Sequence, residues 1–199
     1  MRVIRTRSSH RPRTAVSRAG FTLAELMVVV VLLGIMAALV APNIDMSRAR
    51  ADTAAMQVRS IFQQAHRTAV SQQHQVIVSV DTAGRRIRFV EDRNNDRTIQ
   101  ATDRVRWIPI EEGTRFGVPP VGVNGAATAA VVGGTATPID GLPSLIFRRD
   151  GSVNAEGQIY LQSDGRRVYH RAIVLNKAIG RASWFRLRYG TTTWDEAGY

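Results

Sequence analysis

The longest apolar stretch of the chain runs from Phe21 to Ala41, and Glu25 is its one charged residue. A stretch of about 20 apolar residues can cross a bilayer as a helix, so the pattern predicts a transmembrane helix over residues 21–41. A carboxylate inside such a helix costs roughly 2.5–3.5 kcal/mol on insertion scales and usually has a partner. Glu25 is therefore a candidate functional residue; the alternative is that it lies near the helix start and reaches the lipid head groups.

After this stretch the spacing of the apolar positions changes. In residues 42–74 they recur every three or four residues, which predicts an amphipathic helix that continues the membrane helix. Pro42 lacks an amide donor and clashes with the preceding turn, so we expect a kink there. The apolar positions of this helical spine are Ala54, Val58, Ile61, Ala65 and Ala69.

From residue 75 to residue 199 the pattern is that of β-strands, with apolar and polar residues alternating. Residues 82–84, Thr-Ala-Gly, suit the turn of a hairpin, and residues 122–137, rich in glycine and alanine, predict a flexible loop. The fold class is therefore α+β, with one long helix packed on an antiparallel sheet. The expected strands are residues 76–80, 86–90, 105–110, 144–147, 158–161, 168–175 and 183–189.

The segment before the apolar stretch, residues 1–20, contains six arginines and no acidic residue. A basic segment followed by an apolar stretch is typical of an export signal, and arginine-rich flanks stay on the cytoplasmic side. We therefore expect a single-pass protein with a cytoplasmic N-terminus and an exported head of residues 75–199.

The sequence Gly20-Phe21-Thr22-Leu23-Ala24-Glu25 resembles the class III signal of type IV pilins and type II secretion pseudopilins. The resemblance implies that a prepilin peptidase removes residues 1–20 after Gly20 and methylates the new amine of Phe21. It also implies an inner-membrane protein with a periplasmic head and with other pilins or pseudopilins as partners. Glu25 would pair with the α-amine of Phe21, in its own or a neighbouring subunit, as a filament assembles. Ala24 departs from the family, in which a bulkier aliphatic residue is commoner.

The head resembles the GspH/FimT family, which contains H-type minor pseudopilins of type II secretion and FimT-like minor pilins. The resemblance rests on Phe89-Val90 entering Glu91-Asp92-Arg93-Asn94-Asn95-Asp96, on Ile146-Phe147-Arg148-Arg149-Asp150-Gly151, and on Gly180-Arg181. It implies an H-type minor pseudopilin at or near the tip of a pseudopilus.

Composition excludes several other functions. The chain has no cysteine, which rules out disulfides and cysteine-based sites. No phosphate-binding loop, dinucleotide fingerprint or zinc-protease motif is present, so we expect neither an enzyme nor a cofactor. Of the 27 basic residues, six lie in the leader, and the remaining 21 stand against 16 acidic residues. This mature charge of +5 is too small to establish nucleic-acid binding by itself.

One loop has the spacing of a calcium site. Asp92, Asn94, Asp96 and Asp103 occupy ligand positions of an EF-hand-like loop, but Arg97 replaces the glycine of its sharp turn. We therefore favour a hairpin loop closed by side-chain turns and expect no metal, with calcium as the alternative.

DNA capture is the rival function. FimT-like proteins are implicated in DNA uptake through a Gly-Arg-x-Arg element, and this chain has Gly180-Arg181-Ala182-Ser183, without the second arginine. Alternation predicts that Arg186 and Arg188 share one strand face with Trp184, opposite core-facing Phe185 and Leu187. The candidate phosphate contacts are Lys177, Arg181, Arg186 and Arg188. We rank the pseudopilin first, DNA capture second, and a membrane-anchored protein with neither role third.

Overall fold

The computed structural model describes residues 20–40, 46–123, 129–134 and 138–197, with the side chains of residues 38–40 left aside. The chain divides into two compact units, Met1–Ile44 and Asp45–Tyr199. The first unit contains helix α1, Leu23–Val40. In the part of the chain described, no helix combines the length and the apolar character that crossing a bilayer requires. Residues 1–19 of the predicted leader and the predicted kink at Pro42 lie outside the described residues.

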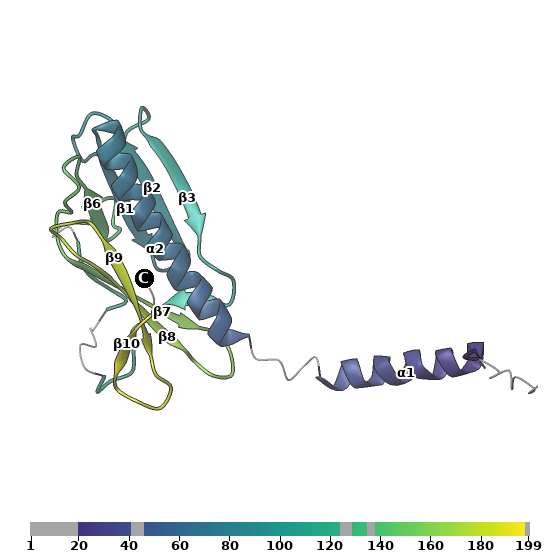
Figure 1. Cartoon of the computed structure of the whole chain (residues 1–199). Helices are drawn as coiled ribbons and strands as arrows, with labels where there is room; N and C mark the ends of the chain where they lie inside the picture. The colour runs from purple at the N-terminus through teal and green to yellow at the C-terminus, as the bar shows by residue number, and fades with distance from the viewer. Residues whose placement is uncertain (1–19, 41–45, 124–128, 135–137, 198–199) are drawn as a thin grey trace, which may run out of the picture. The chain divides into compact units, whose positions relative to one another are not determined.

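The second unit, which we call the head, is organised around helix α2, Ser47–Gln72 (Figure 1). Its apolar residues recur at helical spacing and are buried along one face, while Gln73 ends the helix in the left-handed conformation, with a φ of 58°. Within the predicted helical spine, residues 42–74, the structure has a helix at residues 47–72. The buried apolar residues of α2 are Ala51, Ala54, Ala55, Val58, Ile61, Phe62, Ala65 and Ala69.

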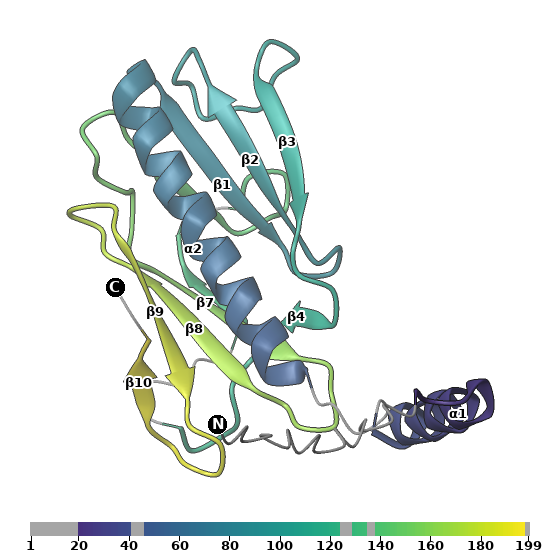
Figure 2. The ribbon, with the colours of Figure 1, turned by 45° about the vertical axis from the view of Figure 1, so that its right-hand side comes forward.

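Two antiparallel sheets pack against α2 (Figure 2). The four-stranded sheet has the order β3-β2-β1-β6, and the six-stranded sheet has the order β10-β9-β8-β7-β4, with β5 also paired to β7. The strands of the first sheet are β1 (Gln75–Asp81), β2 (Arg86–Asp92), β3 (Arg104–Pro109) and β6 (Ser144–Phe147). Those of the second are β4 (Thr114–Phe116), β5 (Val131–Gly133), β7 (Gly157–Ser163), β8 (His170–Leu175), β9 (Ala182–Leu187) and β10 (Trp194–Glu196).

The main core lies between α2 and the two sheets. Phe62 of α2 contacts Phe147 of β6 with ring centroids 5.9 Å apart, and both rings are buried. Every buried apolar residue of the described chain lies between Ala51 and Ala197, so the head contains a complete core of its own. A compact unit with its own core is expected to fold without the rest of the chain.

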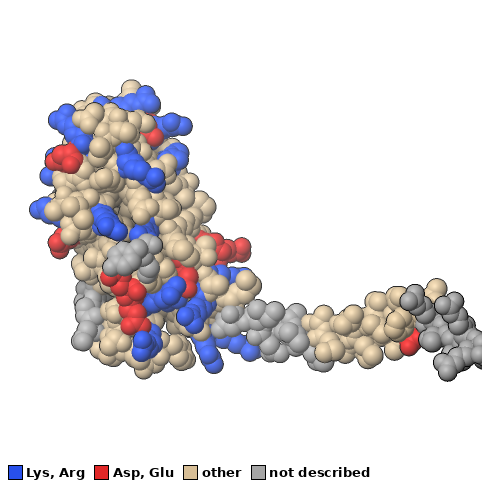
Figure 3. All heavy atoms as spheres, viewed as in Figure 1, with Lys and Arg blue, Asp and Glu red and all other residues tan. Residues whose placement is uncertain are grey.

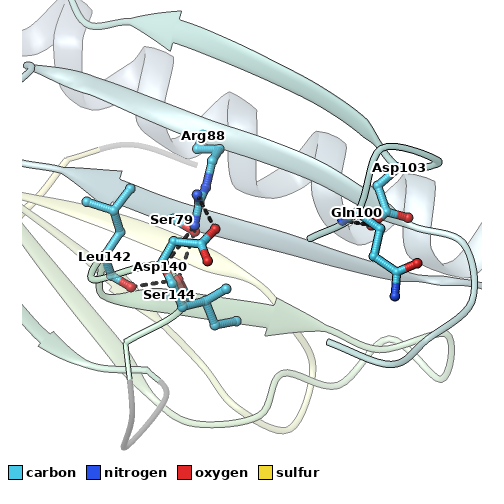
Figure 4. A network of polar contacts seen from close by, with 8 residues as sticks. Ser79, Arg88, Gln100, Asp103, Asp140, Leu142 and Ser144 are labelled. Carbon is cyan, nitrogen blue, oxygen red and sulfur yellow. Dashed lines mark hydrogen bonds and ion pairs between the residues drawn. The ribbon is translucent and has the colours of Figure 1, made fainter. Parts of the chain in front are cut away.

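The other face of the four-stranded sheet is covered by a tight turn that an ion pair holds in place (Figure 4). Asp140 and Gly141 have φ angles of 50° and 74°, the two positive values of a type I′ turn. The Arg88 guanidinium donates to Asp140 Oδ2 at 2.8 Å, to the Ile139 carbonyl at 2.9 Å and to Ser79 Oγ at 3.2 Å. Because Arg88 is only 6% exposed, these bonds satisfy a charge that would otherwise be buried without a partner.

The predicted α+β class, with a long helix packed on antiparallel sheet, is confirmed by this arrangement. The predicted flexible loop at residues 122–137 is wrong in one part, because β5 lies within it and pairs with β7. β4 and β10 have no counterpart among the predicted strands. Strands of three residues are too short to show an alternation in the sequence, and their pairing depends on a neighbouring strand that is already formed.

Candidate functional site

The N-terminal segment that carries the processing motif forms the start of α1. The backbone amide of Glu25 donates to Thr22 Oγ1 at 3.2 Å, and the amide of Leu26 donates to the Thr22 carbonyl at 3.1 Å. Thr22 therefore caps the helix, and Glu25 occupies the third helical position, where a glutamate completes a capping box. The cap at Thr22 was missed at the sequence level, although the Thr-x-x-Glu spacing is its signal; the structure shows the Glu25 backbone amide, and not its carboxylate, in this cap.

Gly20 and Phe21, the residues on either side of the predicted cleavage bond, are open to solvent. Phe21 is 83% exposed, and a side chain added at Gly20 would meet no atom within 4 Å. The φ of Gly20 is also not in the left-handed region that favours glycine. Among the described residues, nothing in the fold requires a glycine at this position.

Helix α1 carries apolar side chains of its own on every face. Its large side chains from Leu23 to Met36 are between 48% and 80% exposed. A helix that is apolar all round is normally covered by lipid or by other protein. Glu25, near its start, is the one acidic residue of the helix.

The four candidate phosphate contacts lie in two different settings. Lys177 and Arg181 are exposed in the turn between β8 and β9, where Arg181 borders a groove with Gln63, His66 and Arg67 of α2. Arg188 pairs with Asp195 at 3.1 Å, and Arg186 donates to Asp52 Oδ1 at 3.2 Å. Of the four candidate phosphate contacts, Arg186 and Arg188 thus have an acidic partner within the head.

The predicted assignment of the β9 faces is wrong for Trp184 and Phe185, although Leu187 is buried as predicted. Ala182 and Trp184 belong to the core, whereas Phe185 is half-buried, so the even-numbered residues of this strand face α2. Arg186 follows them on that face, and its guanidinium carbon lies 4.8 Å from the centre of the Trp184 ring. Alternation in a sequence separates two faces but does not say which of them meets the core.

A charge cluster that the sequence analysis missed lies beneath Arg186. Arg171 of β8 is directly opposite Arg186 in the sheet, an arrangement that is destabilising for like charges. Asp52 of α2 offsets the repulsion between the two arginines, because its Oδ1 accepts from Arg171 Nε at 2.6 Å as well as from Arg186. Burial lowers the pKa of Arg171, which is 1% exposed, and the hydrogen bond to Asp52 opposes that shift.

The loop proposed as a calcium site is held together by its own hydrogen bonds. Arg97 donates its amide to Asp92 Oδ2 at 2.9 Å, and Thr98 donates its amide to Asp96 Oδ1 at 2.7 Å. Gln100 donates its amide to Asp103 Oδ2 at 2.9 Å (Figure 4). Asn94 donates its side-chain amide to Asp96 at 2.9 Å. Within the described residues no group of three or more acidic, histidine or cysteine side chains is placed to hold a metal ion. The geometry favours side-chain turns over a calcium site.

Asp92 provides a stability test of this loop. Its side chain is fully buried, Oδ1 has no hydrogen-bond partner, and burial raises its pKa above 3.8. Because the pKa is raised in the folded state, the contribution of this carboxyl to stability is fully present below pH 3.8 and is lost as the pH rises through the folded-state pKa. Asp92→Asn removes the buried charge and keeps the oxygen that accepts from Arg97. We expect it to stabilise the head by about 1 kcal/mol at pH 7, with the gain vanishing below pH 3.8.

Urea unfolding of the two proteins at several pH values measures this difference. Asp103→Asn is the matched control, because both of its oxygens accept backbone amides and no gain is expected there. A wild-type head that calcium stabilises, with the effect lost in Asp92→Asn, would contradict the expectation and support the calcium site.

Comparison with known proteins supports the N-terminal motif. Residues 16–41 match the family model described as the prokaryotic N-terminal methylation motif. The match covers the segment on which the resemblance to type IV pilins rests, so the predicted methylation motif is confirmed. No curated protein matches the chain. A solved structure similar to it is that of the minor pseudopilin EpsH from the type 2 secretion system of Vibrio cholerae, at 14% sequence identity and a TM-score of 0.46. The match covers 71% of this chain and 99% of that chain.

Proposed function

We propose that this protein is a structural subunit of a pilus-like filament, specifically an H-type minor pseudopilin of a type II secretion system. The observation that carries the proposal is the methylation motif at residues 16–41, which coincides with an exposed apolar helix and a single glutamate near its start. The proposed partners are other pseudopilins and the prepilin peptidase.

The proposed topology follows from the charges on either side of the apolar segment. Residues 1–20 would stay in the cytoplasm until cleavage after Gly20, residues 21–41 would anchor the chain in the inner membrane, and the head would lie in the periplasm. Methylation would then fall on the amine of Phe21.

The role proposed for Glu25 is to admit the subunit to the filament. Cleavage after Gly20 creates an α-amine at Phe21, four residues before Glu25. A carboxylate without a partner is costly in lipid, whereas one paired with an ammonium group is tolerated. Pairing with the amine of a neighbouring subunit would therefore favour assembly over the isolated membrane helix.

Two substitutions of Glu25 separate this charge pairing from helix capping. Glu25→Gln keeps a side chain that can complete the capping box but has no charge, and Glu25→Val removes both. Both variants should still insert into the membrane, because each is less costly in lipid than a carboxylate. We expect both to be lost from filaments, measured as the fraction of subunit recovered with sheared filaments when the other pseudopilins are coexpressed.

The comparison between the variants decides which role Glu25 has. Thr22→Ala, which removes the capping hydroxyl and keeps the charge, is the matched control and should still assemble. Wild-type incorporation of Glu25→Gln would rule out charge pairing as the role of Glu25.

DNA capture, as a FimT-like minor pilin, remains the rival proposal. It would rest on Lys177 and Arg181, because Arg186 and Arg188 already have acidic partners. Neighbouring genes separate the two: a secretin and further pseudopilins favour secretion, whereas pilus and competence genes favour uptake.

A further inference from the structure

Arginines gather at the end of the head where α2 begins. Two hollows adjoin there, one of about 400 Å³ and one of about 500 Å³, and both are lined by Tyr169, Leu187, Arg188 and Tyr189. They lie between the first turn of α2 and the tips of the β7–β8 and β9–β10 hairpins. We call this surface the basic pole, after the arginines that line the two hollows: Arg48, Arg166, Arg167, Arg171, Arg186 and Arg188.

The basic pole carries more positive than negative charge. Asp52 is shared by Arg171 and Arg186, Asp195 pairs with Arg188, and Glu196 lines the first hollow. These three acidic residues stand against six arginines. Figure 3 shows arginine and lysine over the face in view, with acidic side chains among them toward the bottom of the head. In the described part of the chain, Arg48, Arg166 and Arg167 are exposed and form no ion pair.

Apolar and aromatic side chains are exposed beside these arginines. Val168 is 42% exposed, Tyr189 is 64% exposed, and Met46, just before α2, is 56% exposed. Tyr189 lies against Tyr169 at 6.0 Å between ring centroids, and the Arg167 guanidinium carbon lies 5.6 Å from the Tyr189 ring. Tyrosines and apolar residues among arginines are the composition of surfaces at the membrane–water boundary, where rings lie at head-group depth and guanidinium groups meet phosphates.

The position of the basic pole in the chain also favours a location at the membrane surface. Five residues, 42–46, separate the end of the proposed membrane segment at Ala41 from Ser47, the first residue of α2. Five residues span at most about 18 Å when fully extended. If the proposed membrane segment ends at Ala41, the short connection keeps Arg48 close to the bilayer surface.

We infer that the basic pole binds the phosphate head groups of anionic phospholipids in the leaflet from which the head emerges. This inference rests on the proposed membrane anchor. Arg48, Arg166 and Arg167, which form no ion pair with any residue that the structure describes, supply the charge, while Val168 and Tyr189 enter the head-group layer. Bound in this way, the head lies on the membrane before it is drawn into a filament.

Vesicle binding by the head, residues 45–199, tests the inference. We expect the head to sediment with vesicles that contain phosphatidylglycerol and not with vesicles of phosphatidylcholine alone. Each arginine near an anionic surface contributes about 1 kcal/mol, about fivefold in affinity. Arg166→Ala combined with Arg167→Ala should therefore weaken binding to the anionic vesicles about 25-fold.

The matched control is Arg93→Ala combined with Arg149→Ala. Both residues are exposed, and they lie beside the other end of α2, where Gln75 contacts Asn95 and His66 adjoins Gly151. The net charge changes by the same amount, so binding should stay close to that of the wild type. An equal loss in the two double variants would mean a non-specific effect of net charge and would overturn the inference.

Duplex DNA is the competing ligand for a surface rich in arginine. Val168→Ser separates the two, because it removes an apolar side chain that a bilayer would take up and leaves every phosphate contact in place. It should weaken vesicle binding and leave any DNA binding unchanged. DNA binding that needs Arg166 and Arg167, together with no vesicle binding, would overturn the inference in favour of nucleic acid.

The head used in these tests lacks residues 1–44, so the result does not depend on processing, on Glu25 or on filament assembly. A second measurement uses the intact chain in bilayers of the two compositions. Amide hydrogen exchange of residues 164–170 should be slower in the bilayer with phosphatidylglycerol. Equal exchange in the two bilayers would contradict the inference even if the subunit assembles normally.

Discussion

Asp52→Ala is expected to destabilise the head by about 3–5 kcal/mol, the largest single-site effect on stability that we predict. The change removes the carboxylate that Arg171 and Arg186 share, and Arg171, which is 1% exposed, loses its charged partner in a site with little solvent. An uncompensated buried charge carries a cost of this size, whereas an intact buried pair adds little net stability. Urea unfolding of the head followed by far-ultraviolet circular dichroism measures the loss.

Two further variants show that the cost comes from the stranded charge. Arg171→Met in the Asp52→Ala background removes the charge that was left unpaired and should recover much of the lost stability. Asp195→Ala is the matched control, because its ion pair with Arg188 is exposed and such pairs contribute 0–1 kcal/mol. A loss of stability in Asp52→Ala no greater than that in Asp195→Ala would show that Arg171 needs no partner.

Gly20→Val is expected to abolish removal of the leader. A prepilin peptidase would have to fit the residue before the cut bond into its active site, and the added side chain meets no atom of the described residues within 4 Å. The variant therefore tests recognition without disturbing the fold. Coexpression with a prepilin peptidase followed by mass spectrometry of the N-terminus should show a wild-type chain that begins at methylated Phe21, and a variant that keeps residues 1–20.

Gly34→Val is the matched control, since a side chain at Gly34 of α1 also meets no atom within 4 Å. It should be processed like the wild type. A mature wild-type chain that begins at a residue other than Phe21 would contradict the pilin-like assignment, whatever the fold of the head.

Local patterns in the sequence determined the N-terminal motif, the α+β class, α2 and seven of the strands. These features depend on residues that are close together along the chain. The motif is a run of consecutive residues. The apolar positions of a helix recur every three or four residues, and those of a strand recur every two. The β1–β2 hairpin also depends on neighbours, because four residues join its strands. The Thr22 cap was readable in the same way, from the Thr-x-x-Glu spacing.

Only the tertiary structure decided the charge cluster at Asp52 and the basic pole. Asp52 and Arg171 are 119 residues apart, and nothing in the sequence near either residue indicates the other. The same holds for the ion pair between Arg88 and Asp140, for the core-facing side of β9, and for the short strands β4, β5 and β10. Each depends on which face of a strand or helix packs against its neighbour. The burial of apolar area across the whole head determines that face, and local sequence preference does not.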